Sequence, residues 1–187
     1  MNVIIFGPPG AGKGTQALNI VKKFQLYQIS TGDLLRNEVK NQTSIGKDIE
    51  NIISKGDFAT DEIVNELIKK AIINPKNKDK LIFDGYPRSL SQAKNLDSLL
   101  NKSNQKIDFI FYLNVKKETI IDRIKKRKML EKRSDDNLST ILKRYDTYME
   151  TTKPVLDFYS KKNNFYEIDG DAKIHEISSK IEIILSL

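Results

Sequence analysis

The residues best suited to chemistry form one glycine-rich stretch near the start of the chain, Gly7-Pro8-Pro9-Gly10-Ala11-Gly12-Lys13-Gly14-Thr15. It follows a short apolar run at residues 3–6 and precedes a helical pattern, so the predicted order is strand, glycine loop and helix. The backbone N–H groups of such a loop can converge on one anion, and the positive end of the following helix points at the same place. Lys13 adds a cation that can reach a terminal phosphate. The stretch therefore predicts a cradle for the phosphates of a nucleoside triphosphate.

This loop departs at one position from the general phosphate-loop pattern G-x-x-x-x-G-K-[ST]. Gly7, Gly12 and Lys13 fit the pattern. Gly14, however, stands where a serine or threonine would contact a magnesium ion, and Thr15 follows one step later. The alternative interpretation is a glycine-rich turn that binds nothing. The strand and the helix on either side favour the phosphate cradle, and Thr15 remains a candidate Mg²⁺ ligand through water.

A second motif, Asp84-Gly85-Tyr86-Pro87-Arg88, follows the apolar run at residues 81–83. If that run is a strand of a parallel sheet, the Asp84 carboxylate emerges at the same sheet edge as the glycine loop. There it would hold Mg²⁺, directly or through water; the alternative role is to cap the turn that follows. The guanidinium of Arg88 can bind two phosphate oxygens at once. The motif thus predicts a metal ligand and a phosphate ligand beside the cradle.

Composition narrows the choice of metal and of partners. The 187 residues include no cysteine and one histidine, His175, which excludes disulfides, thiolate sites and a histidine cluster, and with them zinc. A hard ion with oxygen ligands, Mg²⁺, is the metal expected. The formal net charge of +7 fits nucleic-acid binding, a site for anionic nucleotides or a lysine-rich solvated surface, and the last accounts for most of the excess.

Neither a membrane span nor a targeting segment is predicted. No apolar stretch approaches the length that a transmembrane helix needs, and the N-terminus lacks the basic leader of a signal peptide. We therefore expect a cytoplasmic protein with no membrane partner.

The elements that must position these residues alternate along the chain. Short, continuous apolar runs predict five strands, at residues 3–6, 27–29, 81–84, 109–113 and 165–168. Helical patterns with one apolar face fall between them. This alternation predicts an α/β fold of the P-loop NTPase type, a five-stranded parallel sheet flanked by helices that binds ligands at the carboxyl ends of its strands.

Two segments break this alternation. Residues 31–60 show helical signals but no strand, and they predict a small helical insertion. Residues 128–132 are polar, lie between two helical patterns and are flanked by Arg127 and Arg133, which predicts a short loop. Pro154 is expected to interrupt the long helix that follows or to start a new one.

Three motifs together resemble the adenylate kinases. They are the loop at residues 7–15, Ile29-Ser30-Thr31-Gly32-Asp33-Leu34-Leu35-Arg36, and Asp84-Gly85-Tyr86-Pro87-Arg88. The displaced Gly14-Thr15 ending is similar to that family's own loop, and the likeness extends along the whole chain to Ile168-Asp169-Gly170. The resemblance implies reversible phosphoryl transfer from MgATP to AMP, giving two ADP.

The resemblance also implies a division of the chain into three parts. A P-loop core would comprise residues 1–29, 60–126 and 134–187, and an AMP-binding insertion residues 30–59. Residues 127–133 would form a lid over ATP that is shorter than the lid of the long bacterial form and, without cysteine, cannot bind zinc. We expect the protein to be a monomer.

The residues implied to bind ATP are Gly10, Ala11, Gly12, Lys13, Gly14, Thr15, Arg123, Arg127 and Ala172. Arg123 would stack against the adenine, Arg127 would reach the phosphates, and Ala172 would offer only its backbone carbonyl to the base. Independently of the resemblance, Arg123 and Arg127 are four residues apart and so share a helix face, where a guanidinium can cover an aromatic base. Without the other motifs, a solvated basic face would be the better interpretation of these two arginines.

The residues implied to bind AMP are Thr31, Arg36, Asp57, Phe58, Ala59, Gly85, Tyr86, Pro87, Arg88, Gln92, Arg133 and Arg144. Those implied to act in catalysis are Lys13, Arg88, Arg133 and Arg144, which would neutralise charge on the transferred phosphoryl group. The phosphate of AMP is already an anionic nucleophile, so no general base is needed. Closure of the insertion and the lid over both substrates would exclude water.

Three other functions remain as alternatives. A kinase for UMP and CMP would share the fold and the reaction; Thr31 and Gln92 favour adenine, because an amide can pair with its ring edge as donor and acceptor at once. A basic nucleic-acid-binding protein is disfavoured, because the aromatic residues are few and do not alternate with the basic runs. A regulatory P-loop ATPase would hydrolyse ATP without AMP.

Overall fold

Five parallel strands form the centre of the computed structural model, which describes residues 1–54, 59–131 and 138–187. The strands are β1 (Val3–Phe6), β2 (Tyr27–Ser30), β3 (Leu81–Asp84), β4 (Phe109–Asn114) and β5 (Phe165–Asp169), in the spatial order β2-β3-β1-β4-β5. Every neighbouring pair is parallel. The predicted fold class and all five predicted strands are confirmed, with ends that differ by at most one residue.

Helices connect the parallel strands. In chain order they are α1 (Lys13–Phe24), α2 (Thr31–Lys40), α3 (Ser44–Ser54), α4 (Asp61–Ile73), α5 (Leu90–Lys102), α6 (Lys117–Glu131), α7 (Leu138–Thr151), α8 (Lys153–Tyr159) and α9 (Ile174–Leu185), with a short 3₁₀ turn, η1, at Pro75–Asn77. Pro154 lies in the first turn of α8, so the proline starts a new helix, which was one of its two predicted effects.

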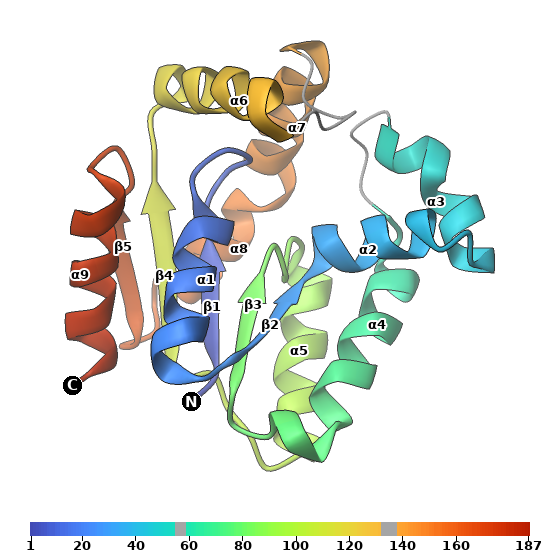
Figure 1. The fold of residues 1–187 in the computed structure, drawn as a ribbon. Helices are drawn as coiled ribbons and strands as arrows, with labels where there is room; N and C mark the ends of the chain where they lie inside the picture. The colour runs from blue at the N-terminus through green and yellow to red at the C-terminus, as the bar shows by residue number, and fades with distance from the viewer. Residues whose placement is uncertain (55–58, 132–137) are drawn as a thin grey trace.

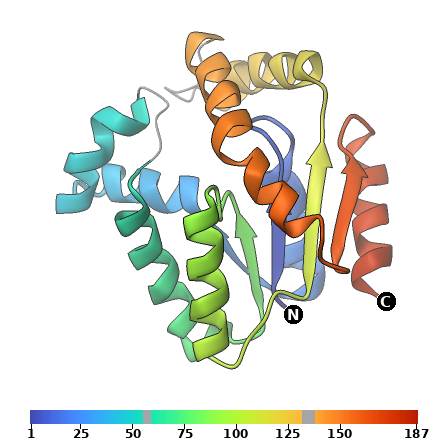
Figure 2. The same cartoon turned by 180° about the vertical axis from the view of Figure 1, so that it is seen from behind.

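The strand side chains alternate between two hydrophobic layers, as the period of a β-strand requires. Ile4 and Phe6 of β1 pack with α4, α5 and α8 on one face, whereas Val3 and Ile5 pack with α1 and α9 on the other. Figure 1 shows α1 and α9 in front of the sheet, and Figure 2, from behind, shows α5 and α8 covering the opposite face. Burial on both faces explains why the strands are continuous apolar runs.

The first predicted insertion is helical where the structure describes it. The helices α2 and α3 pack on each other and extend to one side of the sheet in both views (Figures 1 and 2). Gly46 allows the close approach, because a Cβ at this position would collide with the carbonyl of Glu38. Ile49 of α3 is fully buried against α2 and α4 neighbours in the larger apolar cluster.

The expectation of a polar loop from residue 128 was wrong for the part that the structure describes. Helix α6 continues to Glu131, so residues 128–131 are helical. Lys, Met, Leu and Glu are all strong helix formers, and their propensity extends the helix beyond the point where its apolar stripe ends. Residues 132–137, which include the rest of the expected loop, lie outside the described residues.

The sheet order places a topological switch between β1 and β3, because the chain leaves β1 toward β2 on one side of the sheet and leaves β3 toward β4 on the other. Ligands of open parallel sheets bind beyond the carboxyl ends of the strands at such a point. The glycine loop follows β1 directly, at this position. Among the described residues, no helix combines the length and the apolar character that crossing a membrane requires.

Candidate functional site

The glycine loop folds tightly between β1 and α1. Gly10 and Gly12 adopt φ angles of +83° and +94°, which favour glycine, and the Ala11 N–H donates to the Pro8 carbonyl at 3.1 Å. A Cβ on Gly10 would lie 2.8 Å from the Cγ1 atom of Ile124, so the loop packs closely against α6, which crosses above it in Figure 1. Helix α1 begins at Lys13 and points its N-terminus into the loop, as an anion site requires.

Lys13 is held inside this loop. Its Nζ donates to the carbonyl oxygens of Gly7 at 2.7 Å and Pro8 at 3.1 Å. Burial lowers the pKa of Lys13 from 10.5 to about 8; Asp84 opposes the shift, while three arginines, Arg88, Arg144 and Arg127, add to it. The positive charges of the three arginines therefore repel the charge of Lys13, and a bound polyphosphate would reduce this repulsion.

Arg88 comes from the loop after β3. Its Nε donates to the Gly85 carbonyl at 2.7 Å, and its own carbonyl accepts from the Thr152 hydroxyl at 3.3 Å. Burial, together with the neighbouring Arg144, lowers the pKa of Arg88 to about 10, against the attraction of Asp84. A guanidinium kept charged in this position favours an anionic ligand.

Lys13, Arg88 and Arg144 line one pocket beside the glycine loop. Its wall is formed by residues from β1, the two motifs, α7 and the start of α8, namely Ile5, Phe6, Gly7, Pro9, Lys13, Gly85, Pro87, Arg88, Arg144, Tyr148 and Thr152. Residues from the first motif and from the second thus meet at one place, as the sequence predicted from the parallel sheet.

Asp84 ends β3 and lies next to the start of α1. A Cβ on Gly14 would lie 3.7 Å from its Oδ2 atom, and the Gln28 side-chain amide donates to the same oxygen at 3.3 Å. Burial raises the pKa of Asp84, while Lys13 and Arg88 hold it down. Thr15, the second predicted metal ligand, is exposed on α1. The described residues contain no cluster of three metal-ligating side chains.

Arg123 connects the glycine loop with the segment after β5. Its guanidinium donates to the carbonyl of Ala11 at 3.2 Å and to that of Gly170 at 2.8 Å. Ala172, the predicted adenine contact, follows in the same segment and packs at the edge of the apolar layer under α1 and α9. Arg127 lies one turn further along α6. The structure thus brings the predicted adenine ligands beside the phosphate loop.

A second group of predicted residues surrounds Gly85, close to the N-terminal ends of α2, α4 and α5. The Thr31 hydroxyl donates to the Gly85 carbonyl at 2.9 Å, and Arg36 forms an ion pair with Asp33 on α2. Buried neighbours complete this group, namely Ala59, Tyr86, Pro87 and Gln92. The predicted residues Asp57, Phe58 and Arg133 lie outside the described part of the chain.

The Gln92 amide in this group is held at both ends. Its Nε2 donates to Oδ1 of Asp61 at 2.7 Å, and its Oε1 accepts from the backbone N–H of Arg88 at 2.8 Å. Asp61 was not among the predicted site residues, because in the sequence it reads only as an acidic residue in the first turn of a helix.

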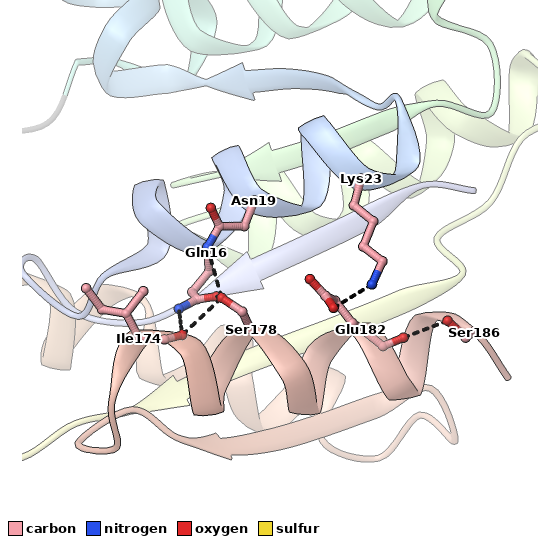
Figure 3. Close-up of polar contacts among 7 residues, drawn as sticks. All are labelled: Gln16, Asn19, Lys23, Ile174, Ser178, Glu182 and Ser186. Carbon is pink, nitrogen blue, oxygen red and sulfur yellow. Dashed lines mark hydrogen bonds and ion pairs between the residues drawn. The ribbon is translucent and has the colours of Figure 1, made fainter.

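Gln16 is a second residue that sequence reasoning missed. Figure 3 shows its side chain between α1 and α9, where Nε2 donates to the Ile174 carbonyl at 3.0 Å and Oε1 accepts from the Ser178 hydroxyl at 2.8 Å. Asn19 donates to the same hydroxyl at 2.9 Å. Gln16 lies one turn before Ile20 on the buried face of α1, and a polar side chain on such a stripe is a signal that could have identified it.

Comparison with known proteins agrees with the motifs. The sequence model of a protein family described as adenylate kinase matches residues 5–164. An adenylate kinase of Pelagibacter ubique (strain HTCC1062) is 49% identical to this chain over 213 residues, covering 100% of both chains. An adenylate kinase of Porphyromonas gingivalis (strain ATCC 33277) is 37% identical over 185 residues, covering 99% of this chain and 95% of the relative. One from Archaeoglobus fulgidus is 36% identical over 212 residues, covering 99% and 98%.

Proposed function

Because this chain belongs to the adenylate kinase family, we propose that it transfers the γ-phosphoryl group of ATP to AMP, reversibly, giving two molecules of ADP. The observation that carries this proposal is the pocket where Lys13, Arg88 and Arg144 meet, since it joins the phosphate loop to the motif after β3. The convergence of cations at this point supports a site where the phosphates of two nucleotides would meet end to end.

We infer that ATP occupies the side of the glycine loop and α6. The loop N–H groups and Lys13 would bind the phosphates, and Arg123 is close enough to the loop to cover the adenine. The backbone of Ala172 would contact the edge of the base, and Arg127, on the same helix as Arg123, would reach the phosphates. These roles come from the family's motifs and are supported by the convergence of the side chains.

AMP would occupy the group around Gly85. Arg88 and Arg36 would bind its phosphate, and the Gln92 amide would pair with the edge of adenine. Thr31 and Ala59 would line the sugar and the base. The predicted contacts of Asp57, Phe58 and Arg133 complete this proposal from outside the described residues.

The residues present fit a magnesium ion that arrives with ATP. Asp84 offers a buried carboxylate oxygen beside the start of α1, and Mg²⁺ is often held by one carboxylate together with substrate phosphates and water. When bound, the ion would neutralise charge on the phosphate oxygens. Thr15, exposed one step beyond, would contact its water shell.

Catalysis by this chain would consist of positioning and charge stabilisation. Lys13, Arg88 and Arg144 would hold the transferring group in line with the AMP phosphate, together with Arg133 of the expected lid, and would neutralise the charge that spreads over its oxygens. The attacking AMP oxygen is already ionised, so no side chain has to remove a proton. Closure of residues 30–59 and 127–133 over the substrates would keep water from competing.

The lid and the assembly state form part of the same proposal. The alignment with the Pelagibacter ubique relative is longer than this chain, so that relative carries inserted residues, whereas the alignment with the Porphyromonas gingivalis relative is not. We propose a short lid in this chain, because only five residues separate Arg127 from Arg133. We also propose a monomer, which light scattering on the purified protein would test.

A coupled assay tests the function. The purified protein is supplied with MgATP and, in separate reactions, AMP, UMP, CMP, GMP or no acceptor, and ADP formation is followed. We expect rapid turnover with AMP and much slower turnover with the other acceptors. Without an acceptor, we expect negligible hydrolysis of ATP. Preference for UMP and CMP would favour the pyrimidine-nucleotide alternative, and rapid hydrolysis without an acceptor would favour a regulatory ATPase.

A further inference from the structure

The side-chain amide of Gln92 is fixed in one orientation by its two partners. Asp61, in the first turn of α4, accepts from Nε2, and the Arg88 N–H donates to Oε1. Rotating the amide by 180° would place Oε1 against a carboxylate and Nε2 against an N–H group, so both contacts would become repulsive. The identity of the two amide atoms therefore follows from the chemistry of the neighbours.

Asp61 is itself held in place. Its second oxygen, Oδ2, accepts from the Ser89 hydroxyl at 3.2 Å, and Ser89 Oγ accepts in turn from the Gln92 backbone N–H at 3.1 Å. The carboxylate thus contacts two residues in the first turn of α5 at once. Gln92 is 5% exposed, so the contact between the carboxylate and the amide is largely shielded from water, which strengthens it.

After these two contacts, the amide keeps one N–H and one lone pair, and no other partner for them exists among the described residues. Adenine presents an amino donor at N6 and an acceptor at N1, which match an oxygen and an N–H side by side. Hypoxanthine and guanine present an acceptor at O6 and a donor at N1, the reverse pattern, and they would need the rotated amide. A site that holds its polar groups fixed rejects the mismatched ligand strongly.

We propose that Asp61 is a positioning residue for acceptor specificity: it locks the Gln92 amide in the orientation that accepts AMP and rejects IMP and GMP. This inference rests on the proposed function, because it assumes that Gln92 faces the base of the acceptor nucleotide. Asp61 itself does not touch the nucleotide in this proposal.

The test measures kcat and KM for AMP and IMP at saturating MgATP in wild type, Asp61→Ala and Asp61→Asn. Loss of one charged hydrogen bond predicts a KM for AMP about tenfold higher in Asp61→Ala. The preference for AMP over IMP should fall by about the same factor, while kcat with AMP and the KM for ATP stay within about twofold. Asp61→Asn keeps an acceptor oxygen, so its KM for AMP should lie between those of wild type and Asp61→Ala, about threefold above wild type.

The matched control is Glu62→Ala, which removes the same charge from the same turn of α4 but from an exposed side chain that contacts its own backbone and Thr60. We expect wild-type constants for this variant. Equal KM values for AMP in wild type, Asp61→Asn and Asp61→Ala would overturn the proposal, as would an equal rise in Glu62→Ala. If Asp61→Ala does not fold, a KM for AMP at the wild-type value in Asp61→Asn overturns it on its own.

A double-mutant cycle separates action through Gln92 from a general structural effect. In a Gln92→Ala background, Asp61→Ala should not raise the KM for AMP any further, because the group that it positions is gone. The same rise with and without the amide would contradict the inference. Failure of the proposed function is recognised separately, since the wild-type protein would then show no preference for AMP among the acceptors.

Discussion

The Gln16 side chain in the first turns of α1 donates a hydrogen bond to the backbone carbonyl of Ile174, the first residue of α9, at 3.0 Å and across 158 positions of sequence. Gln16 follows the phosphate loop, and Ile174 follows the segment proposed to contact adenine. The contact therefore ties the two halves of the proposed ATP site together through one buried amide (Figure 3).

Replacing Gln16 by alanine should lower the free energy of unfolding by about 1–3 kcal/mol, because the packing and the two hydrogen bonds of a buried side chain are lost. The same pair of helices supplies the control. Lys23 forms an ion pair with Glu182 at 2.6 Å, but its side chain is 54% exposed, so Lys23→Ala should change stability by less than about 1 kcal/mol. Urea unfolding measures both, and equal losses would contradict the importance of the buried amide.

Replacing Arg88 by alanine should leave the protein folded and lower kcat by about 10²-fold or more, because a guanidinium aimed at the transferred phosphoryl group is removed. Steady-state rates with MgATP and AMP test this, alongside circular dichroism to check folding. Lys94→Ala, which removes an exposed charge from α5, serves as the control and should retain its activity. Near-wild-type turnover in Arg88→Ala would refute the assignment.

The sequence predicted best those features that depend on local pattern and on sheet topology. The strands were found because burial on both faces makes them continuous apolar runs, and the meeting of Lys13 with Arg88 was found because parallel strands end at one edge. The end of α6 was missed, because helix propensity carried it past the apolar stripe.

Pairings between distant polar side chains could not be read from the sequence. Asp61 and Gln92 are 31 positions apart, and neither their residue types nor their spacing predicts a contact. The contact depends on how α4 and α5 pack. Arg123 likewise finds the carbonyls of Ala11 and Gly170 only because α6 crosses above the loop. Such contacts follow from tertiary packing, which the hydrophobic periodicity of a sequence does not predict.

Lys13→Met should stabilise the nucleotide-free protein at pH 7 by about 1–3 kcal/mol while abolishing activity, because it removes a buried cation from among arginines. The pKa of Lys13 is about 8 in the folded protein and 10.5 ordinarily, so between these values the unfolded chain binds more protons and stability rises with pH. The advantage of Lys13→Met should therefore be full below pH 8 and shrink as the pH rises toward 10.5. Urea unfolding at several pH values measures it, and a constant difference would contradict the cause.

Removing the hydroxyl of Tyr159 should stabilise the protein or leave it unchanged. The ring is fully buried beside Phe6, with centroids 5.6 Å apart, and among the described residues its hydroxyl has no hydrogen-bond partner. Burial accordingly raises the pKa of Tyr159. Tyr159→Phe keeps the packing and removes an uncompensated polar group, so we expect a gain of up to about 1 kcal/mol in the free energy of unfolding.

The control for that variant is Tyr86→Phe, the same chemical change at a side chain that is 1% exposed. The Tyr86 hydroxyl donates to Asn65 Oδ1 at 2.7 Å and accepts from the Asn95 amide at 3.3 Å, so its removal leaves partly buried partners unsatisfied. We expect a loss of about 1–2 kcal/mol there. Urea unfolding of the two variants side by side gives opposite signs if hydrogen bonding decides the outcome, whereas changes of the same sign and size would show that burial of the hydroxyl alone sets its effect.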